Sequence, residues 1–272
     1  MHFYLSEINI YPIKSLGGIS LQHAVLEDKG LEHDRRWMLV DEEGMFVTQR
    51  KYDELSMLQV HIGPELLTVT HKTDPAQRLS FRLNETTGRN INVSIWNDVA
   101  TGTEVSTIAN NWFSDFMKMK VILVRMPLNE KRLVDLRYAR QQEVVSFADG
   151  YPCLLIGQAS LDGLNAKLQQ PVRMDRFRPN LVFTGGDAHI EDSFDHFQLG
   201  NIRFQAVKPC ARCVLITIDQ QTGIKGKEPL KTLAGYRTTG KKILFGQNLI
   251  HQGLGTISVG DELKIHSYKA EI

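Results

Sequence analysis

The stretch Ile91-Asn-Val-Ser-Ile-Trp96 alternates apolar with polar residues and runs directly into the turn-forming pair Asn97-Asp98. Such a run predicts a half-buried β-strand followed by a turn. Similar runs recur along the chain at Ile8–Ile13, Trp37–Val40, Leu66–Thr70, Tyr151–Ile156, Asn180–Thr184, Phe197–Val207 and Val214–Asp219. Their spacing predicts a mainly β protein of the sandwich or barrel type, with a few helices, rather than alternating βαβ units.

Two helices interrupt the β-rich runs. The first is expected near Thr107–Met119 with Thr107 as its N-cap, and Ile108, Trp112, Phe113 and Phe116 on one face. The second is expected near Ser160–Leu168 with Ser160 as its cap. The basic stretch Lys131–Arg140 is expected to be an irregular loop with its charges facing water. We place an N-terminal β-rich domain at residues 1–120 and a C-terminal domain at residues 121–272.

Composition narrows the class of protein. The chain has 272 residues, and its net charge of +1 comes from 32 basic and 31 acidic residues, which favours neither nucleic acid nor an anionic membrane as main partner. The N-terminus lacks the pattern of a signal peptide, and no apolar run is long enough to span a membrane. Three cysteines favour a reducing cytoplasm over a disulfide framework, and cannot supply the four thiolates of a typical iron–sulfur cluster.

Lys208-Pro-Cys-Ala-Arg-Cys213 is the most informative segment, because it holds two of the three cysteines three residues apart. Zinc would need two more ligands, and only Cys153 could add sulfur. A dithiol redox centre usually precedes a helix, whereas the residues after Cys213 are typical of a strand. A single thiolate ligand to a metal held mainly by a cofactor fits, and Arg212 and Lys208 would favour the thiolate. Both cysteines could instead be buried small hydrophobes.

Cationic residues gather at strand ends beside glycine and short polar residues. Lys14 and Ser15 precede two glycines, which let a backbone approach a phosphate closely. Arginine offers a bidentate geometry to phosphate, and Arg176 and Arg178 would share a face if they lay on a strand. Each of these residues could alternatively be a surface charge or a structural ion pair. The candidates are Lys14, Ser15, Arg35, Arg50, Arg176, Arg178 and Asn180.

Taken together and in this order, the segments resemble the MOSC family, and within it the branch of the amidoxime-reducing components and the bacterial reductases of N-hydroxylated bases. The resemblance spans nearly the whole chain. It rests on Tyr11–Ser15, Asp34–Trp37, Val47–Arg50, Ser146–Pro152, Ala159-Ser160, Phe177–Asn180, Glu191-Asp192, Lys208–Cys213, Glu228–Leu233, Phe245–Asn248 and Gly260-Asp261.

The resemblance implies a MOSC N-terminal domain and a MOSC β-barrel that together bind a pterin-based molybdenum cofactor. Cys213 would be the metal ligand and the catalytic residue. Lys14, Ser15 and Arg35 would contact the phosphate end of the cofactor, and Arg178 and Asn180 would add further contacts. Arg50 and Arg176 are carried over as additional cofactor contacts. The implied reaction is reduction of small N-hydroxylated compounds by oxygen-atom removal at molybdenum.

Some bacterial relatives append a ferredoxin domain, whereas this chain ends soon after an expected last strand near Asp261–Ile265. We also expect no membrane anchor of the kind that mitochondrial members carry. Without a ferredoxin domain, the electrons are expected to come from a separate flavin or iron–sulfur reductase. No proton donor stands out, and Asp192 and Asp219 are candidates only by position. A carrier of the cofactor or of sulfur is the main alternative function. Pyridoxal phosphate binding through Lys14 or Lys208 is a third.

Overall fold

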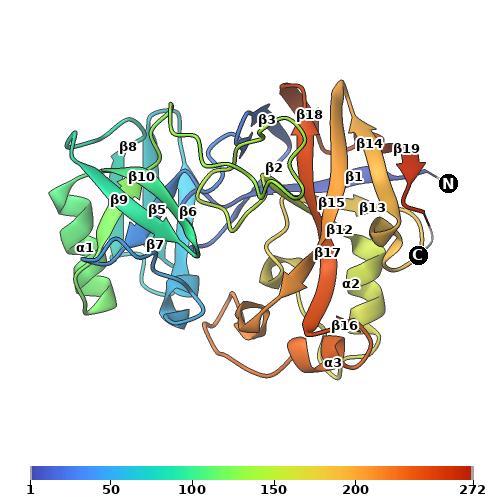
Figure 1. Ribbon diagram of the computed structural model, residues 1–272. Coiled ribbons are helices and arrows are strands. Elements are labelled where there is room, and N and C mark those ends of the chain that lie inside the picture. The colour runs from blue at the N-terminus through green and yellow to red at the C-terminus, as the bar shows by residue number, and fades with distance from the viewer. Residues whose placement is uncertain (1, 271–272) are drawn as a thin grey trace.

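The computed structural model describes residues 2–270 and has the mainly β architecture that the sequence predicts. Its largest sheet has nine strands and occupies the right half of the view in Figure 1. In spatial order these are β19 (Lys264–Tyr268), β14 (Phe194–Leu199), β15 (Ile202–Arg212), β17 (Lys242–Gln252), β12 (Cys153–Gly157), β13 (Leu181–Thr184), β1 (Tyr4–Ile10) and β2 (Ile19–Leu21), with β16 (Thr238–Thr239) paired to β17.

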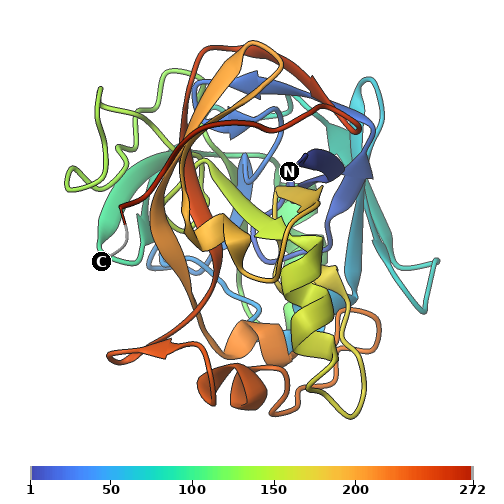
Figure 2. The same cartoon turned by 90° about the vertical axis from the view of Figure 1, so that its right-hand side faces the viewer.

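The nine-stranded sheet curls around its core but does not close into the barrel that the sequence predicts (Figure 2). The amide N–H of Leu5 donates to Asp261 O, and that of Leu263 donates to Phe3 O, at 2.8 and 2.9 Å. These bonds join β1 to the segment before β19. Residues 258–261 form a turn there, with Asp261 N–H bonded to Ser258 O, so the contact does not extend into a continuous ladder.

The left half of Figure 1 contains two smaller sheets. One has the order β5 (Trp37–Val40), β11 (Ile122–Arg125), β10 (Asp98–Glu104) and β9 (Asn90–Ile95), and the other β6 (Leu58–Ile62), β7 (Leu66–His71) and β8 (Arg78–Arg82). A third small sheet is formed by β18 (Gly255–Ser258), β3 (His23–Glu27) and β4 (Gly30–Leu31). The strands expected from residues 37, 66 and 91 onward are confirmed to within one residue.

The N-terminal segment up to Leu31 packs with both halves of the molecule. Phe3, Leu5 and Leu31 belong to one core with side chains from β12–β15, while Ile13 and Leu16 join a second core with the small sheets and the first helix. Strand β11, which follows residue 120, pairs with β5. The domain boundary at residue 120 stays a prediction, and the N-terminal segment ties the two halves together.

The first helix, α1 (Thr107–Met117), confirms the expected helix, but two details differ. Its N-cap is Ser106, whose hydroxyl accepts the Ala109 N–H at 3.3 Å, rather than Thr107. Its buried face carries Ala109, Phe113 and Met117, whereas Ile108 is exposed. Ile108 lies one residue from Ala109, and neighbouring helix positions point about 100° apart.

The second helix, α2 (Gln158–Asn165), packs against β12 and β13 and begins two residues before the expected cap. Ser160 is therefore not its N-cap. The buried Ser160 hydroxyl instead donates to the carboxylate of buried Glu191 at 2.8 Å. The remaining short helices are α3 (Leu230–Ala234) and the 3₁₀ segments η1 (Asp53–Met57), η2 (Met174–Arg176), η3 (Ile190–Asp192) and η4 (Val214–Thr217).

The strand character predicted for Phe197–Val207 is confirmed, whereas two other predictions for the later part of the chain were wrong. Phe197–Val207 is a hairpin of β14 and β15, because Gly200 at φ +54° makes the turn between them. Val214–Thr217 is the 3₁₀ segment η4 instead of a strand, held by a bond from Ile218 N–H to Leu215 O. The last strand, β19, begins at Lys264, three residues later than expected.

Residues 131–140 are irregular, as predicted, and Arg137 faces water. Arg132, however, is buried, because its guanidinium binds several backbone carbonyls of the segment that follows. Among residues 2–270, none of the helices is both apolar enough and long enough to cross a bilayer.

Candidate functional site

A cleft lies between the two halves of the protein and collects most of the predicted site residues. Lys14, Ser15, Arg35 and Arg50 line it from the N-terminal half. Arg178, Asn180, Cys210 and Cys213 line it from the C-terminal half. Five cationic side chains and one carboxylate, Asp149, line this cleft in the part of the chain that the structure describes, although the whole protein is almost neutral. The cleft is therefore suited to an anionic ligand.

Cys213 is the exposed cysteine of the cleft, whereas Cys210 is half-buried and Cys153 is buried. Cys213 follows β15 in an extended conformation, with φ −123° and ψ −178°, and caps η4. Burial raises the pKa of the Cys153 thiol, which makes that residue a poor thiolate. A metal that enters the cleft therefore meets the sulfur of Cys213 as its accessible thiol.

The geometry disfavours the two other readings of the cysteine pair. Three residues of extended chain span roughly 10 Å, whereas a disulfide needs Cα atoms within about 7 Å. Cys210 Sγ instead accepts a hydrogen bond from the Arg212 guanidinium at 3.1 Å. Residues 2–270 contain no group of three or more His, Cys, Asp or Glu side chains arranged to hold a metal, so a zinc site has no protein ligand set.

Two arginines from different halves are held against one tyrosine ring. The guanidinium carbons of Arg35 and Arg178 each lie 4.2 Å from the centroid of the buried Tyr11 ring. Arg35 also donates to both carboxylate oxygens of buried Asp34, at 2.8 and 2.6 Å, and to Asn180 Oδ1 at 3.1 Å. Stacking fixes both guanidinium groups before any ligand arrives, and the paired hydrogen bonds to Asp34 fix Arg35 further.

Lys14 is buried and donates to Phe147 O at 2.8 Å and to the Asp149 carboxylate at 2.5 Å. Burial lowers its pKa to about 8, although Asp149 opposes this shift. The ammonium is still mainly charged at neutral pH, and it has three donors, of which these bonds use two. Burial likewise lowers the pKa of Arg178 to about 10, which leaves it charged.

Three predicted site residues have backbone conformations that are rare for residues with side chains. Ser15, Arg35 and Arg178 have φ values of +74°, +49° and +54°. Each such residue costs about 1 kcal/mol or more and persists only where the surrounding structure enforces it. Residues in this conformation cluster at functional sites, so their joint occurrence in one cleft supports a binding role for this wall.

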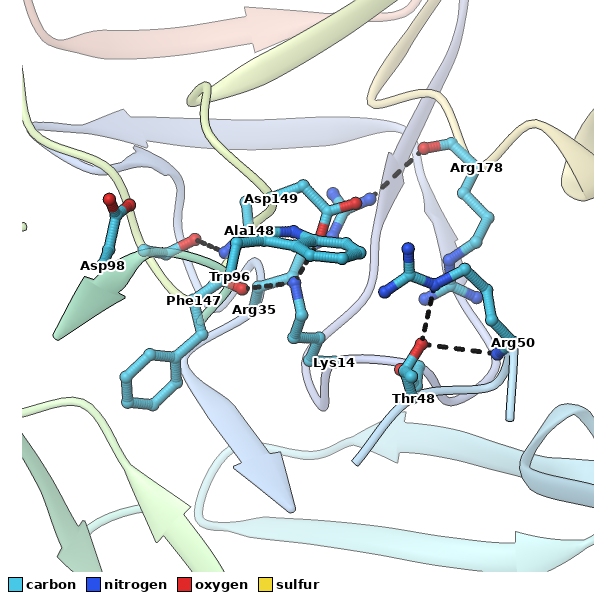
Figure 3. Close-up of polar contacts among 12 residues, drawn as sticks. Lys14, Arg35, Thr48, Arg50, Trp96, Asp98, Phe147, Ala148, Asp149 and Arg178 are labelled. Carbon is cyan, nitrogen blue, oxygen red and sulfur yellow. Dashed lines mark hydrogen bonds and ion pairs between the residues drawn. The ribbon is translucent and has the colours of Figure 1, made fainter. Parts of the chain in front are cut away.

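The sequence did not single out Asp149, yet the structure holds this carboxylate firmly (Figure 3). Besides Lys14, it accepts the Trp96 indole N–H at 3.3 Å. The buried Arg132 guanidinium donates to the carbonyls of Ser146, Ala148 and Asp149, at 2.9, 2.5 and 3.0 Å. No motif in a single sequence reveals this role of Arg132, because its partners are backbone groups.

Arg50 also lines the cleft, and Figure 3 shows it beside Thr48. Its guanidinium carbon is 3.8 Å from the centroid of the Trp96 ring, and its Nε donates to Thr48 Oγ1 at 3.3 Å. Trp96 is 46 % exposed and occupies the first position of the two-residue turn between β9 and β10, at φ +57°. Such turns favour Asn or Gly, so a tryptophan here is strained.

Gln49, the residue before Arg50, connects the two halves of the protein. The buried side-chain amides of Gln49 and Gln220 exchange two hydrogen bonds, at 3.2 and 3.1 Å. Gln220 lies seven residues after Cys213. This amide pair therefore couples the position of Arg50 to the segment that carries the exposed thiol.

Arg176 is the predicted site residue that the structure does not bring into the cleft. It lies in η2 and not on a strand, so it does not share a face with Arg178. Its guanidinium donates to Asp219 at 2.7 Å and faces a different hollow. Asp192 is likewise paired with Arg237. Neither of the two carboxylates considered as proton donors lines the cleft.

Comparison with known proteins identifies the family to which the chain belongs. The MOSC N-terminal beta barrel domain matches residues 2–120, and the MOSC domain matches residues 142–264. The chain therefore belongs to the MOSC-domain family.

Individual relatives refine this assignment. The human mitochondrial amidoxime-reducing component 1 is 30 % identical over 276 residues, an alignment that covers 94 % of this chain and 81 % of that protein. The rat mitochondrial amidoxime reducing component 2 is 31 % identical, with the same coverage. The molybdenum cofactor sulfurase of Arabidopsis thaliana is 31 % identical over 271 residues, which cover 92 % of this chain and 33 % of that protein. These similarities relate the chain to molybdenum-cofactor function.

The residues of the cleft fit the cofactor that the family implies. A soft thiolate suits the metal, and fixed cations suit a phosphate. Two further polar atoms among the cleft residues, Arg212 Nε and the Tyr151 hydroxyl, are buried without a hydrogen-bond partner in the described structure. Buried polar groups are normally paired, so these atoms have capacity for a ligand.

Proposed function

We propose that the cleft binds a molybdenum cofactor with Cys213 as the protein ligand to the metal, and that the loaded protein reduces N-hydroxylated compounds. The observation that carries the proposal is the position of one exposed thiol in a cleft lined by cations from both halves. The names of the amidoxime-reducing relatives support the substrate class.

In this proposal, Lys14, Ser15 and Arg35 bind the phosphate end of the cofactor, and Arg178 and Asn180 bind its phosphate or pterin. Arg50 adds positive charge to the lining of the cleft. We leave Arg176 out of the binding set because Asp219 engages its guanidinium outside the cleft. The division of the chain at residue 120 would place ligands from both domains around one cofactor.

Reduction of an N-hydroxyl group to N–H consumes two electrons and two protons and releases water. The cofactor would supply the two-electron oxygen-atom chemistry. The chain would hold the cofactor through Cys213 and the cations. Asp149 is the one carboxylate among the described cleft residues, but it is not a proton source: burial opposes the shift, yet the Lys14 ammonium holds the pKa of Asp149 well below its usual range, so the carboxylate stays an anion. The electrons would come from a separate reductase, and the three cysteines cannot provide a four-thiolate relay.

The test is to purify the chain from a host that makes the cofactor, and to measure molybdenum per chain and turnover of benzamidoxime with a chemical reductant. Cys213→Ser should lose both metal and turnover, while Cys210→Ser, the matched control three residues away, should keep most of both. Equal losses in the two variants would instead support a joint role of the cysteines.

A second candidate function is storage or delivery of the cofactor or of its sulfur. The similarity to the Arabidopsis molybdenum cofactor sulfurase favours it. Full loading with molybdenum but no turnover of any N-hydroxylated compound, with several reductants, would support this alternative over the reductase.

A further inference from the structure

We propose that a second hollow, outside the cleft, binds small organic carboxylates that carry an apolar body, and that Arg125 and Trp37 recognise the carboxylate group. We call it the Trp37 hollow. Its volume of about 650 Å³ is in the range of small-molecule sites. Among the described residues, none lines both this hollow and the cleft that contains Cys213. The inference therefore goes beyond the proposed function and does not depend on it.

The Trp37 hollow is formed where three parts of the chain meet. Its lining residues lie within 25–37, at 125–128, and at the turn between β17 and β18 that holds Leu254. Leu128 and Leu254 are 85 % and 67 % exposed, although both are large apolar side chains that line the hollow. The apolar body of a ligand would cover them and remove this surface from water.

Trp37 and Arg125 project into the same region because of the sheet register. The two residues are direct partners in the antiparallel pair of β5 and β11, so their side chains leave the sheet on the same face. The guanidinium carbon of Arg125 lies 5.6 Å from the centroid of the Trp37 ring. Both side chains line the hollow, so one ligand group can approach both.

Both side chains have hydrogen-bonding capacity that the protein does not use. The indole Nε1–H of Trp37 is buried without a partner in the described structure, although buried polar groups are normally paired. Arg125 is half-buried, and its guanidinium takes part in no side-chain hydrogen bond or ion pair among residues 2–270. Burial and the nearby Arg36 both lower the pKa of Arg125, as expected for a cation that lacks an anionic partner.

The other cations of the Trp37 hollow are already neutralised. Arg36 donates to the Glu27 carboxylate at 2.6 Å. Lys29 donates to the Asp28 carboxylate at 3.0 Å. Arg125 is therefore the cation of the described hollow that is left for a ligand.

These features define the chemistry of the ligand. One free guanidinium matches a single negative charge, and its planar fork suits a carboxylate. The Trp37 N–H offers a further donor to an acceptor oxygen, and the two exposed leucines suit an apolar chain or ring. Glu32 is the remaining carboxylate of the hollow, but its side chain is 46 % exposed, so water weakens its repulsion.

Two-dimensional NMR of the full chain labelled at tryptophan reads the site directly, because three tryptophans give three indole N–H signals. Trp96→Phe and Trp112→Phe assign the Trp37 signal by elimination, so the buried ring stays in place. The probes are 4-phenylbutyrate and 4-phenylbutanamide, which share their apolar body and differ in charge. The acid should shift the Trp37 signal in a saturable way and bind about tenfold more tightly than the amide.

The variants separate the charge from the apolar contact. Arg125→Gln should weaken binding of the acid about tenfold and leave the amide unchanged. Arg89→Gln is the matched control, because it removes the same charge next to β9 of the same sheet, where the side chain is 65 % exposed and does not line the hollow. Leu128→Ser should weaken both probes alike, by about threefold.

Three results would each overturn the site: equal affinity for acid and amide, equal effects of the two arginine variants, or shifts confined to the other two indoles. Arg50→Gln tests independence from the cleft, because Arg50 lines the cleft and not the hollow. It should leave the Trp37 titration unchanged. A loss in Arg50→Gln as large as in Arg125→Gln would assign the binding to the cleft and contradict the proposal.

Discussion

Arg132 offers the sharpest test of how the cleft is built, through the substitution Arg132→Met. The side chain is almost fully buried and donates to three backbone carbonyls of the segment that carries Asp149. Methionine has similar length but no donor, so all three carbonyls lose their partner at once.

The expected magnitude follows from those three bonds. Hydrogen bonds that involve a charged group contribute about 1.5 kcal/mol each at the low end of their range, which puts the gross loss at about 4.5 kcal/mol. The ion pair with Asp98 adds little, because that carboxylate is half exposed. Removing a buried charge and burying an apolar chain offset about 1 kcal/mol. We therefore expect the free energy of unfolding to fall by about 3.5 kcal/mol.

Equilibrium unfolding in urea measures this loss, and hydrogen exchange locates it. Amides of residues 146–150 should exchange faster in Arg132→Met, while those of α1 should lose no more protection than the global change explains. Arg137→Met is the control in the same loop, because Arg137 faces water and pairs only locally with Asp135, and it should leave the unfolding transition where it is. A loss below about 1 kcal/mol for Arg132→Met would refute the claim that Arg132 holds the backbone of residues 146–149 in place.

Three further outcomes follow from the site. Sulfate, whose charge is constant between pH 6 and 10, should bind the metal-free cleft more weakly above pH 8. Burial lowers the pKa of Lys14 to about 8, so the Lys14 charge is present below that pH and lost above it. The affinity for sulfate should therefore fall by up to about tenfold per pH unit above pH 8. Lys14→Met should remove most of this dependence, and an unchanged slope in titration calorimetry would count against Lys14. The free energy of unfolding should change in the opposite direction. The buried Lys14 charge destabilises the folded protein below pH 8, and this penalty is relieved as the group loses its proton, so the contribution of Lys14 to stability should rise between pH 8 and 10.5, the ordinary pKa of lysine. Arg178→Gln should lower the molybdenum content at least fivefold while Arg176→Gln leaves it within twofold, and equal contents would contradict the placement of the two arginines. Gln49→Ala should leave the buried Gln220 amide unpaired and lower the free energy of unfolding by about 1–3 kcal/mol. The double variant Gln49→Leu/Gln220→Leu should recover part of that loss. Additive losses would mean that the two amides act independently.

The sequence predicted those parts of the fold that depend on local pattern. Alternation at Ile91–Ile95 and the turn after it marked the β9–β10 hairpin, and apolar spacing marked α1. It failed where distant contacts decide the local structure. The sequence predicts Ser160 as a helix N-cap. Ser160 instead lies within α2, and its hydroxyl donates to the buried Glu191 carboxylate.

The candidate site shows the same contrast between residues that local sequence pattern identifies and residues whose role depends on distant contacts. Cationic residues near turns could be singled out along the chain, and most of them lie in one cleft. Arg176 was indistinguishable from Arg178 in sequence, since only the η2 turn and the distant Asp219 direct it elsewhere. Arg132 binds backbone carbonyls, and Trp96 donates to Asp149, which is distant in the sequence. Contacts of these kinds produce no motif or regular spacing in a single sequence.

X-ray absorption at the molybdenum edge tests the central claim most directly, because it counts the sulfur atoms bound to the metal. The protein as purified with its cofactor should show one more sulfur neighbour than Cys213→Ser reloaded with the same cofactor, and Cys210→Ser should match the wild-type protein. An identical sulfur count in wild-type protein and Cys213→Ser would contradict ligation by that thiolate.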